Sequence, residues 1–226
     1  MSALPKRLPK EIADAQADIM KAAGIYYWAD EVNARKGRAM VIGPEGTPYA
    51  NCPLLFSLEL PMDYPFSSPK VKFLTSDGTT RFHPNLYVDG KVCLSILGTW
   101  QGPKWAAVMT ISTVLSSIQS LLEPNPITNE PGWEKYTLAD TRAKDYADFV
   151  KYRLTSFSYE LLSQWKKGHT PYDFTFFEDV LTERGDELLE KLSKVIRDAA
   201  TQDEVAYSNI TYGMSGKTEW KRLALV

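Results

Sequence analysis

The segment 81–98 constrains the fold of this chain more than any other. Its proline and its Asp-Gly pair are turn residues, and they separate apolar runs of only a few residues. Within this irregular segment Asn85 comes one short turn before Cys93, and an apolar run follows the cysteine. A thiolate attacks a carbonyl well, and the oxygen of the tetrahedral intermediate needs a hydrogen-bond donor beside it. We therefore predict acyl-transfer chemistry, with Cys93 as the nucleophile and the Asn85 amide as the donor.

Composition narrows the class of protein. The chain has 226 residues, which suits one domain with a sizeable extension. Its 26 basic and 28 acidic residues are interleaved without a basic block, so no nucleic-acid partner is predicted. The two cysteines lie far apart in sequence and cannot form a disulfide framework, which indicates a reducing compartment. The two cysteines and two histidines are scattered, so no metal site is predicted.

The sequence also gives expectations about location. Residues 1–7 lack the apolar core of a signal peptide. No apolar run is long enough to cross a bilayer. We expect a monomeric protein of the cytoplasm or the nucleus that does not bind a membrane.

The periodicity of apolar residues predicts a first part that contains both helices and strands, followed by a helical tail. Leu8, Ile12, Ala15 and Ile19 recur at helical spacing and predict an opening helix, in which Pro9 is tolerated only in the first turn. Short apolar runs and alternation then predict strands, and the short turns between them favour an antiparallel meander. The segments that carry these strand patterns are 39–42, 56–60 and 70–73.

Helical spacing returns in the second half of the chain. Pro124 ends the first of these helices, and Gly185 is expected to interrupt or precede the last. Beyond Thr201 there is no firm periodicity, and residues 213–216 are expected to be mobile. The predicted helices are a central one over 111–122 with Thr110 as its cap, one over 143–165 and one over 187–197.

The pattern His83-Pro84-Asn85, a spacer and then Gly90 to Leu97 resembles the signature of the ubiquitin-conjugating enzymes. These enzymes carry ubiquitin, or a ubiquitin-like protein, as a thioester before it passes to a lysine. The resemblance implies an α+β fold with an N-terminal helix, a four-stranded antiparallel meander, an active-site cysteine loop, and central and C-terminal helices. It also implies a catalytic core and a helical C-terminal extension, which we place at 1–168 and 169–226. Further segments match the family in the same order, at 43–49, 63–71 and 110–122.

Within the family, segments 97–105 and 129–133 are most similar to the large, C-terminally extended Z-type enzymes, and the tail over 174–197 is similar as well. Members of that subgroup accept ubiquitin, and some also carry a tandem ubiquitin-like modifier. The implied partners are therefore ubiquitin or a ubiquitin-like protein, an activating enzyme, a ubiquitin ligase and substrate lysines. No bound cofactor is implied, because the activating enzyme uses the ATP and this chain does not.

The resemblance also implies roles for residues around the cysteine. His83 and Pro84 are expected to support the structure of the active-site loop. Many family members place an acidic residue in the loop after the central helix, near the thioester, where this chain has a threonine. The candidates for an acid or a gate near the thioester are Asp89, Thr128, Asn129 and Glu130.

Partner surfaces are implied by the same resemblance. The family contacts its ligases through two apolar loops and the first helix. Phe66 suits one loop, and Trp105 with Ala106 suits the other, which lacks the usual Ser-Pro-Ala. Basic residues on the first helix are expected to dock the activating enzyme, although a solvated helix face explains them equally well. These residues are Lys6, Arg7 and Lys10.

Other interpretations stay open at this point. Cys93 lies between Val92 and Leu94, and such a cysteine is often a small core hydrophobe. Asn85 follows a proline and can simply close an Asx-turn. A catalytically inactive relative that only binds ubiquitin is one rival. A cysteine hydrolase that pairs Cys93 with His169 and an asparagine is another, although a loop and no helix follows the cysteine.

Overall fold

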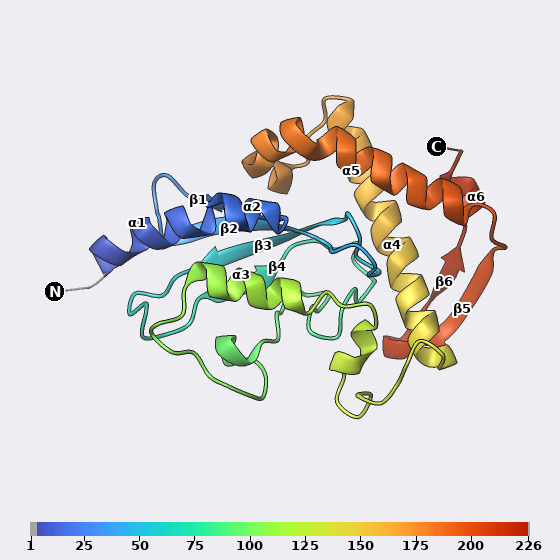
Figure 1. The fold of residues 1–226 in the computed structure, drawn as a ribbon. Helices are drawn as coiled ribbons and strands as arrows, with labels where there is room; N and C mark the ends of the chain where they lie inside the picture. The colour runs from blue at the N-terminus through green and yellow to red at the C-terminus, as the bar shows by residue number, and fades with distance from the viewer. Residues whose placement is uncertain (1–3, 226) are drawn as a thin grey trace.

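The computed structural model describes residues 4–225, without the side chains of residues 4–6 and 172. An antiparallel sheet with the strand order β1-β2-β3-β4 forms the centre of the N-terminal part (Figure 1). Helices α1 and α3 pack against each other and against this sheet. The elements up to the end of this part are α1 (Leu4–Ala15), α2 (Asp18–Ala22), β1 (Ile25–Ala29), β2 (Lys36–Ile42), β3 (Pro53–Glu59), β4 (Lys70–Phe73), η1 (Ser95–Leu97), α3 (Ile111–Ser120) and η2 (Pro126–Asn129).

The predicted strand alternation is confirmed in β3 and β4. Phe56 is buried and Glu59 is exposed, and in β4 the buried Phe73 follows an exposed lysine. The register pairs Phe56 with Phe73, whose ring centroids lie 5.2 Å apart. The sequence analysis did not predict β1. Its first three residues are all buried, so the strand lacks the apolar–polar alternation that marks a half-buried strand.

The opening helix is shorter than its spacing predicts. Helix α1 ends at Ala15, and Ile19 lies in α2, where it is 78% exposed. Pro9 lies inside α1 beyond the first turn, so that expectation is also wrong. Because Pro9 is exposed, water can satisfy the carbonyl that a proline leaves without a donor.

The next two helices lie close to their predicted bounds. Helix α3 begins after Thr110, which exchanges hydrogen bonds with Thr113 in a capping box. Helix α4 (Thr141–Lys166) buries Phe149, Val150, Leu154 and Leu161, and Phe157 is half-buried. The buried residues of α3 are Ile111, Val114, Leu115 and Ile118.

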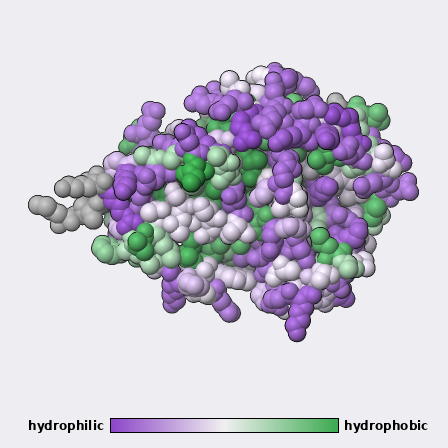
Figure 2. Space-filling view, in the orientation of Figure 1, coloured by the Kyte–Doolittle hydropathy of each residue, from purple (hydrophilic) through white to green (hydrophobic). Residues whose placement is uncertain are grey.

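The segment after α4 folds back over the core. Buried leucines of α5 belong to the same hydrophobic cluster as the sheet, and the outer face of α5 is largely hydrophilic (Figure 2). None of the helices in residues 4–225 combines the length and the hydropathy that a bilayer span requires. The elements of this segment are η3 (Tyr172–Phe177), α5 (Glu178–Ala199), β5 (Val205–Ile210), η4 (Thr211–Gly213), β6 (Met214–Thr218) and α6 (Trp220–Leu223).

Gly185 lies inside α5 and neither interrupts nor precedes the helix, contrary to the prediction. The reason is a close helix contact. A Cβ at position 185 would lie 2.4 Å from the ring of Trp165 on α4. Real Cβ atoms do not approach other atoms so closely, so the absence of a side chain lets the two helices meet here.

We expect Gly185→Ala to lower the free energy of unfolding. Overpacking costs roughly 1–3 kcal/mol and outweighs the gain of roughly 1 kcal/mol in helix propensity. Urea denaturation measures the difference. Thr182→Ala on the exposed face of the same helix is the matched control and should be neutral or stabilising. Equal stability changes in the two variants would contradict the close contact.

An antiparallel hairpin, β5–β6, adds to the helices of the extension. In β5 only Tyr207 is buried, so the sequence shows no apolar alternation there. The hairpin packs on α4 through two ring contacts, Phe149 with Tyr207 at 5.4 Å and Tyr146 with Tyr212 at 5.7 Å. Residues 213–216, which we expected to be mobile, belong to the turn and to the start of β6.

Candidate active site

Cys93 lies in a loop that is attached to the last strand of the sheet. Lys91 forms a bridge with Lys72 of β4, and the Cys93 N–H donates to the Asn85 carbonyl over 2.9 Å. These bonds fold the loop back on itself and bring Asn85 beside the cysteine. Cys93 is only 1% exposed. Neighbouring segments therefore cover almost all of this residue.

The Asn85 side chain is held against the backbone of Cys93. Its Nδ2 donates to the Cys93 carbonyl over 2.8 Å, and the Asn85 N–H donates to Nδ1 of His83 over 2.9 Å. An amide nitrogen carries two hydrogens, so one remains after the bond to the Cys93 carbonyl. The buried Oδ1 has no hydrogen-bond partner among the described residues. Buried polar atoms without a partner are uncommon in native proteins, and Asn85 Oδ1 is one of several such atoms among the described residues.

His83 is placed to support this loop. Its Nε2 lies 2.9 Å from the Leu121 carbonyl and donates to it, while Nδ1 accepts from Asn85. Burial lowers the pKa of His83 from 6.5 to about 3. The imidazole is therefore neutral at neutral pH and has both nitrogens occupied, which excludes a role as the general base. Pro84, the next residue, is buried as well.

The depressed pKa of His83 predicts an acid-sensitive fold. The unfolded chain protonates this histidine near pH 6.5 and the folded chain only near pH 3, so the stabilisation is present above pH 6.5 and is lost as the pH falls toward 3. The slope approaches about 1.4 kcal/mol per pH unit. Urea titrations between about pH 8 and about pH 5 measure it. His83→Gln should flatten that slope, and an unchanged slope would contradict the buried neutral imidazole.

Thr99 holds the other side of the cysteine and was missed by the sequence analysis. Its Oγ1 accepts from the Leu94 N–H over 2.9 Å and donates to the Val92 carbonyl over 2.7 Å. One hydroxyl thus joins the two residues that flank Cys93. No local signal marks this threonine, because its role depends on a turn that only the folded loop forms.

A groove of about 760 Å³ begins at this threonine. One wall is the loop that follows Cys93, and the other is the segment after α3. Thr128 and Asn129, two predicted gate residues, lie on the second wall. Thr128 donates to the Asn125 carbonyl over 2.8 Å, and both gate side chains donate to Glu123. The structure therefore brings these two predicted residues to the active-site loop.

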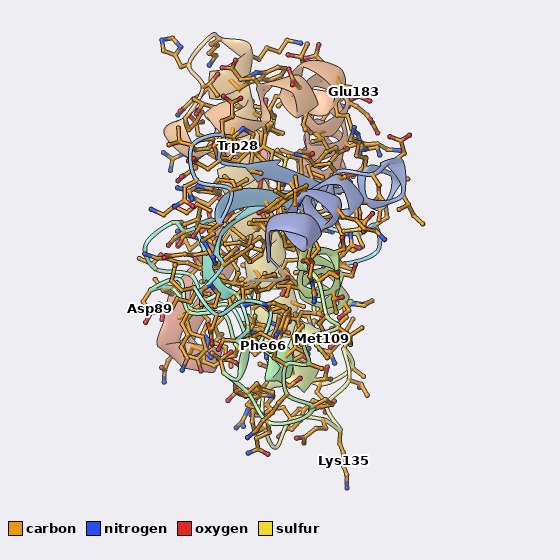
Figure 3. All side chains as sticks on the ribbon, turned by 90° about the vertical axis from the view of Figure 1, so that its left-hand side faces the viewer. Trp28, Phe66, Asp89, Met109, Lys135 and Glu183 are labelled. Atoms are coloured by element: carbon orange, nitrogen blue, oxygen red, sulfur yellow. The ribbon has the colours of Figure 1, made fainter. Side chains whose placement is uncertain are left out.

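The two acidic candidates lie in different environments. Glu130 accepts a hydrogen bond of 2.5 Å from the hydroxyl of Tyr212 in the C-terminal extension. Asp89 is exposed, and its carboxylate accepts from the Lys91 N–H over 3.0 Å (Figure 3). Within the described residues, the hydrogen bonds of these two carboxylates go to Tyr212 and Lys91 and not to Asn85 or Cys93. The residues that line the groove include Thr99, Gln101, Thr128, Asn129 and the acidic Glu134.

The two predicted ligase loops lie side by side. Trp105 joins the loops because its Nε1 donates to the Pro65 carbonyl over 2.7 Å. Phe66 is 79% exposed, and Ala106 is exposed as well. The result is an apolar surface that consists of both loops.

The cations of the first helix differ in what they contact. Arg7 pairs with Glu11 and donates to the carbonyls of Ala107 and Met109, so it fixes the second apolar loop to α1. Lys10 is exposed. The side chain of Lys6 lies outside the described residues. The structure thus engages Arg7 internally and leaves Lys10 exposed for a partner.

A comparison with protein-family models shows which family the chain belongs to. A family model described as ubiquitin-conjugating enzyme matches residues 7–153, which include the sheet, the cysteine loop, the groove and the first half of α4. The chain belongs to the ubiquitin-conjugating enzyme family. The four-stranded sheet and the surrounding helices confirm the predicted fold class.

Known proteins place the chain within this family. It is 50% identical over 113 residues to the human ubiquitin-conjugating enzyme E2 Z, a match that covers 50% of this chain and 32% of that protein. It is 43% identical over 173 residues to the probable ubiquitin-conjugating enzyme protein 17 of Caenorhabditis elegans, covering 72% of this chain and 23% of that protein. The similarity to Z-type enzymes is therefore confirmed, although this chain spans only part of the length of either relative.

A solved structure supports the fold. The E2 domain of a Toxoplasma gondii ubiquitin-conjugating enzyme aligns with a TM-score of 0.53 and 29% identity, covering 68% of this chain and 98% of that domain. The remaining part of the chain lies beyond this shared domain. No group of three or more His, Cys, Asp or Glu within residues 4–225 is arranged to hold a metal ion.

Proposed function

We propose that this chain accepts ubiquitin, or a ubiquitin-like protein, from an activating enzyme as a thioester on Cys93 and transfers it to a lysine. The observation that carries the proposal is the Asn85 amide held directly against Cys93, within a domain of the family. Ubiquitin ligases are the proposed third partner. The activating enzyme supplies the ATP chemistry, so this chain needs no bound cofactor for the two steps described next.

In the loading step the Cys93 thiolate attacks the thioester carbonyl on the activating enzyme. A carbon–sulfur bond forms to Cys93 and another breaks, and the carrier leaves as a thiolate. The bond broken and the bond formed are of the same kind, so the free-energy change of the exchange is close to zero. A strong base beside Cys93 is therefore unnecessary, which agrees with the neutral, occupied His83.

In the transfer step a neutral lysine amine attacks the thioester. A carbon–nitrogen bond forms, the carbon–sulfur bond breaks, the sulfur leaves as a thiolate, and the nitrogen loses a proton to water or a nearby acceptor. An ordinary lysine with a pKa of about 10.4 is mostly protonated at neutral pH, so the site must favour its neutral form. The second amide hydrogen of Asn85 stabilises the oxyanion in this step.

One assay separates the proposal from its rivals. Mixing the protein with activating enzyme, ATP and ubiquitin should give an adduct that is seen on non-reducing gels and is lost when a thiol is added. Cleavage of a ubiquitin C-terminal reporter would instead support the hydrolase, and neither product would support the inactive binding module. The geometry already weighs against the hydrolase. His169 lies beyond the end of α4, a helix of 26 residues and about 39 Å, whose other end contacts the segment before the cysteine loop.

The free, reduced state of Cys52 and Cys93 suits a reducing compartment, and we propose the cytoplasm or the nucleus. We also propose that the chain acts as a monomer. Residues 1–168 are proposed as the catalytic core and 169–226 as the extension.

The apolar surface at Phe66 gives a prediction about ligases. We expect Phe66→Ala to slow ligase-stimulated transfer by on the order of tenfold or more, because exposed aromatic anchors dominate such interfaces. Transfer to free lysine without ligase should not change. Val32→Ala, which alters an even more exposed apolar side chain in another loop, is the control. A loss without ligase, or equal losses in both variants, would contradict a docking role.

A further inference from the structure

Tyr212 in the turn of the C-terminal hairpin contacts two segments that flank the active-site loop. Its ring lies 4.1 Å from the guanidinium carbon of Arg81, in the segment that leads into the cysteine loop. Its hydroxyl donates to Glu130, in the segment after α3, over 2.5 Å. One side chain of the extension therefore joins two segments that are distant in sequence and that flank the site.

Arg81 is the main contact of this tyrosine. The ring of Tyr87, from the cysteine loop, lies 3.6 Å from the Arg81 guanidinium carbon. Arg81 thus has aromatic contacts with the loop and with the extension. Its Nη2 also donates to the Pro84 carbonyl over 2.5 Å, directly before Asn85. Displacing Arg81 would therefore disturb the residue that precedes the proposed oxyanion donor.

The backbone around this contact indicates a constrained position. Tyr212 has a φ of +65°, which non-glycine residues rarely adopt. Such a conformation persists only when neighbouring contacts enforce it. The hairpin supplies them, since the Arg81 N–H approaches Sδ of Met214 at 3.3 Å. Burial raises the pKa of the Tyr212 phenol, so it keeps its proton and donates to Glu130 throughout the neutral range.

We propose that Tyr212 is a positioning residue for lysine transfer, which fixes Arg81 and Glu130 so that the Asn85 amide and the groove keep their reactive arrangement. This inference rests on the proposed function, because it concerns the transfer step at Cys93. It assigns the C-terminal extension a part in catalysis. The extension reaches the chemistry through Arg81 and Glu130 and does not touch the thiol itself.

The test uses the full-length protein, first charged with ubiquitin and then discharged to free lysine over a range of concentrations. We expect Tyr212→Leu to lower the maximal discharge rate by on the order of tenfold, a typical effect of a displaced catalytic group. Its apparent KM for lysine and its loading rate should change little. Tyr212→Phe keeps the ring contact with Arg81 but loses the hydrogen bond to Glu130, so its rate should lie in between.

Tyr207→Leu is the matched control. Tyr207 lies on the same hairpin but packs on Phe149, away from the cysteine loop. The assay is run at a temperature where urea denaturation shows that Tyr207→Leu and Tyr212→Leu are fully folded. Tyr207→Leu should then discharge ubiquitin at the wild-type rate. A second control combines Tyr212→Phe with Glu130→Ala, whose effects should not add, because both remove the same bond.

Two results would overturn the inference. One is wild-type discharge by Tyr212→Leu. The other is equal slowing by Tyr207→Leu and Tyr212→Leu, which would show that the hairpin acts only through general stability. A wild-type protein that never becomes charged would reject the proposed function itself, and that failure is visible before any variant is compared.

Discussion

Replacing Cys93 with alanine is expected to abolish charging completely, and Cys93→Ser is expected to give an adduct that survives thiol treatment. Alanine offers no nucleophile. Serine forms an oxygen ester, which thiols do not cleave as they cleave a thioester. The variants are mixed with activating enzyme, ATP and ubiquitin and separated on gels with and without reductant.

Cys52 supplies the internal control for this experiment. It is fully buried, and burial raises the pKa of its thiol to about 12. It is therefore protonated and poorly nucleophilic at neutral pH. Cys52→Ala should charge like the wild type. Two results would contradict Cys93 as the acceptor of ubiquitin. One is charging that persists in Cys93→Ala, and the other is loss of charging in a folded Cys52→Ala protein.

Asn85→Ala is expected to slow transfer to lysine by about a hundredfold while loading stays largely intact. Removing one oxyanion donor typically costs about 3 kcal/mol, and here the donor is the amide hydrogen not used by the Cys93 carbonyl. Loading is the less demanding step because it exchanges one thioester for another. Single-turnover discharge of the charged protein and the rate of charging are measured separately.

The difficulty is that Asn85 also ties the loop together, through its bond to Cys93 and its N–H bond to His83. Asn85→Asp keeps the size of the side chain and the backbone N–H bond to His83 but removes both amide hydrogens, so the separate measurement of loading and transfer is what distinguishes the two roles. We expect it to discharge as slowly as Asn85→Ala. Equal losses of loading and transfer would instead assign Asn85 to loop structure alone.

Sequence reasoning placed residues correctly where a contact joins neighbours in the chain. The Asn85 and Cys93 pair, the His83 support and the Thr110 cap all involve residues within one loop or one turn. Turn chemistry and helix periodicity are local properties, so their signals survive in the sequence. The family resemblance then supplied the order of elements that local patterns could not give.

The parts that sequence reasoning missed depend on contacts between distant segments. Tyr212 matters because it meets Arg81 and Glu130, and Gly185 because it meets the ring of Trp165. None of these contacts can be inferred from the spacing of residues along the sequence. Arg7 illustrates the same limit, because a basic helix residue that suggests a docking surface instead holds the Ala106–Met109 loop through its carbonyls.

The most direct test of the central claim locates the acyl group itself. The wild-type protein is charged with ubiquitin, digested without reductant and analysed by mass spectrometry, with a conjugating enzyme of known activity proving that the activating enzyme works. We predict one thiol-sensitive ubiquitin remnant, on the peptide that contains Cys93. No remnant in the presence of a working activating enzyme, or a remnant on Cys52, would contradict the account.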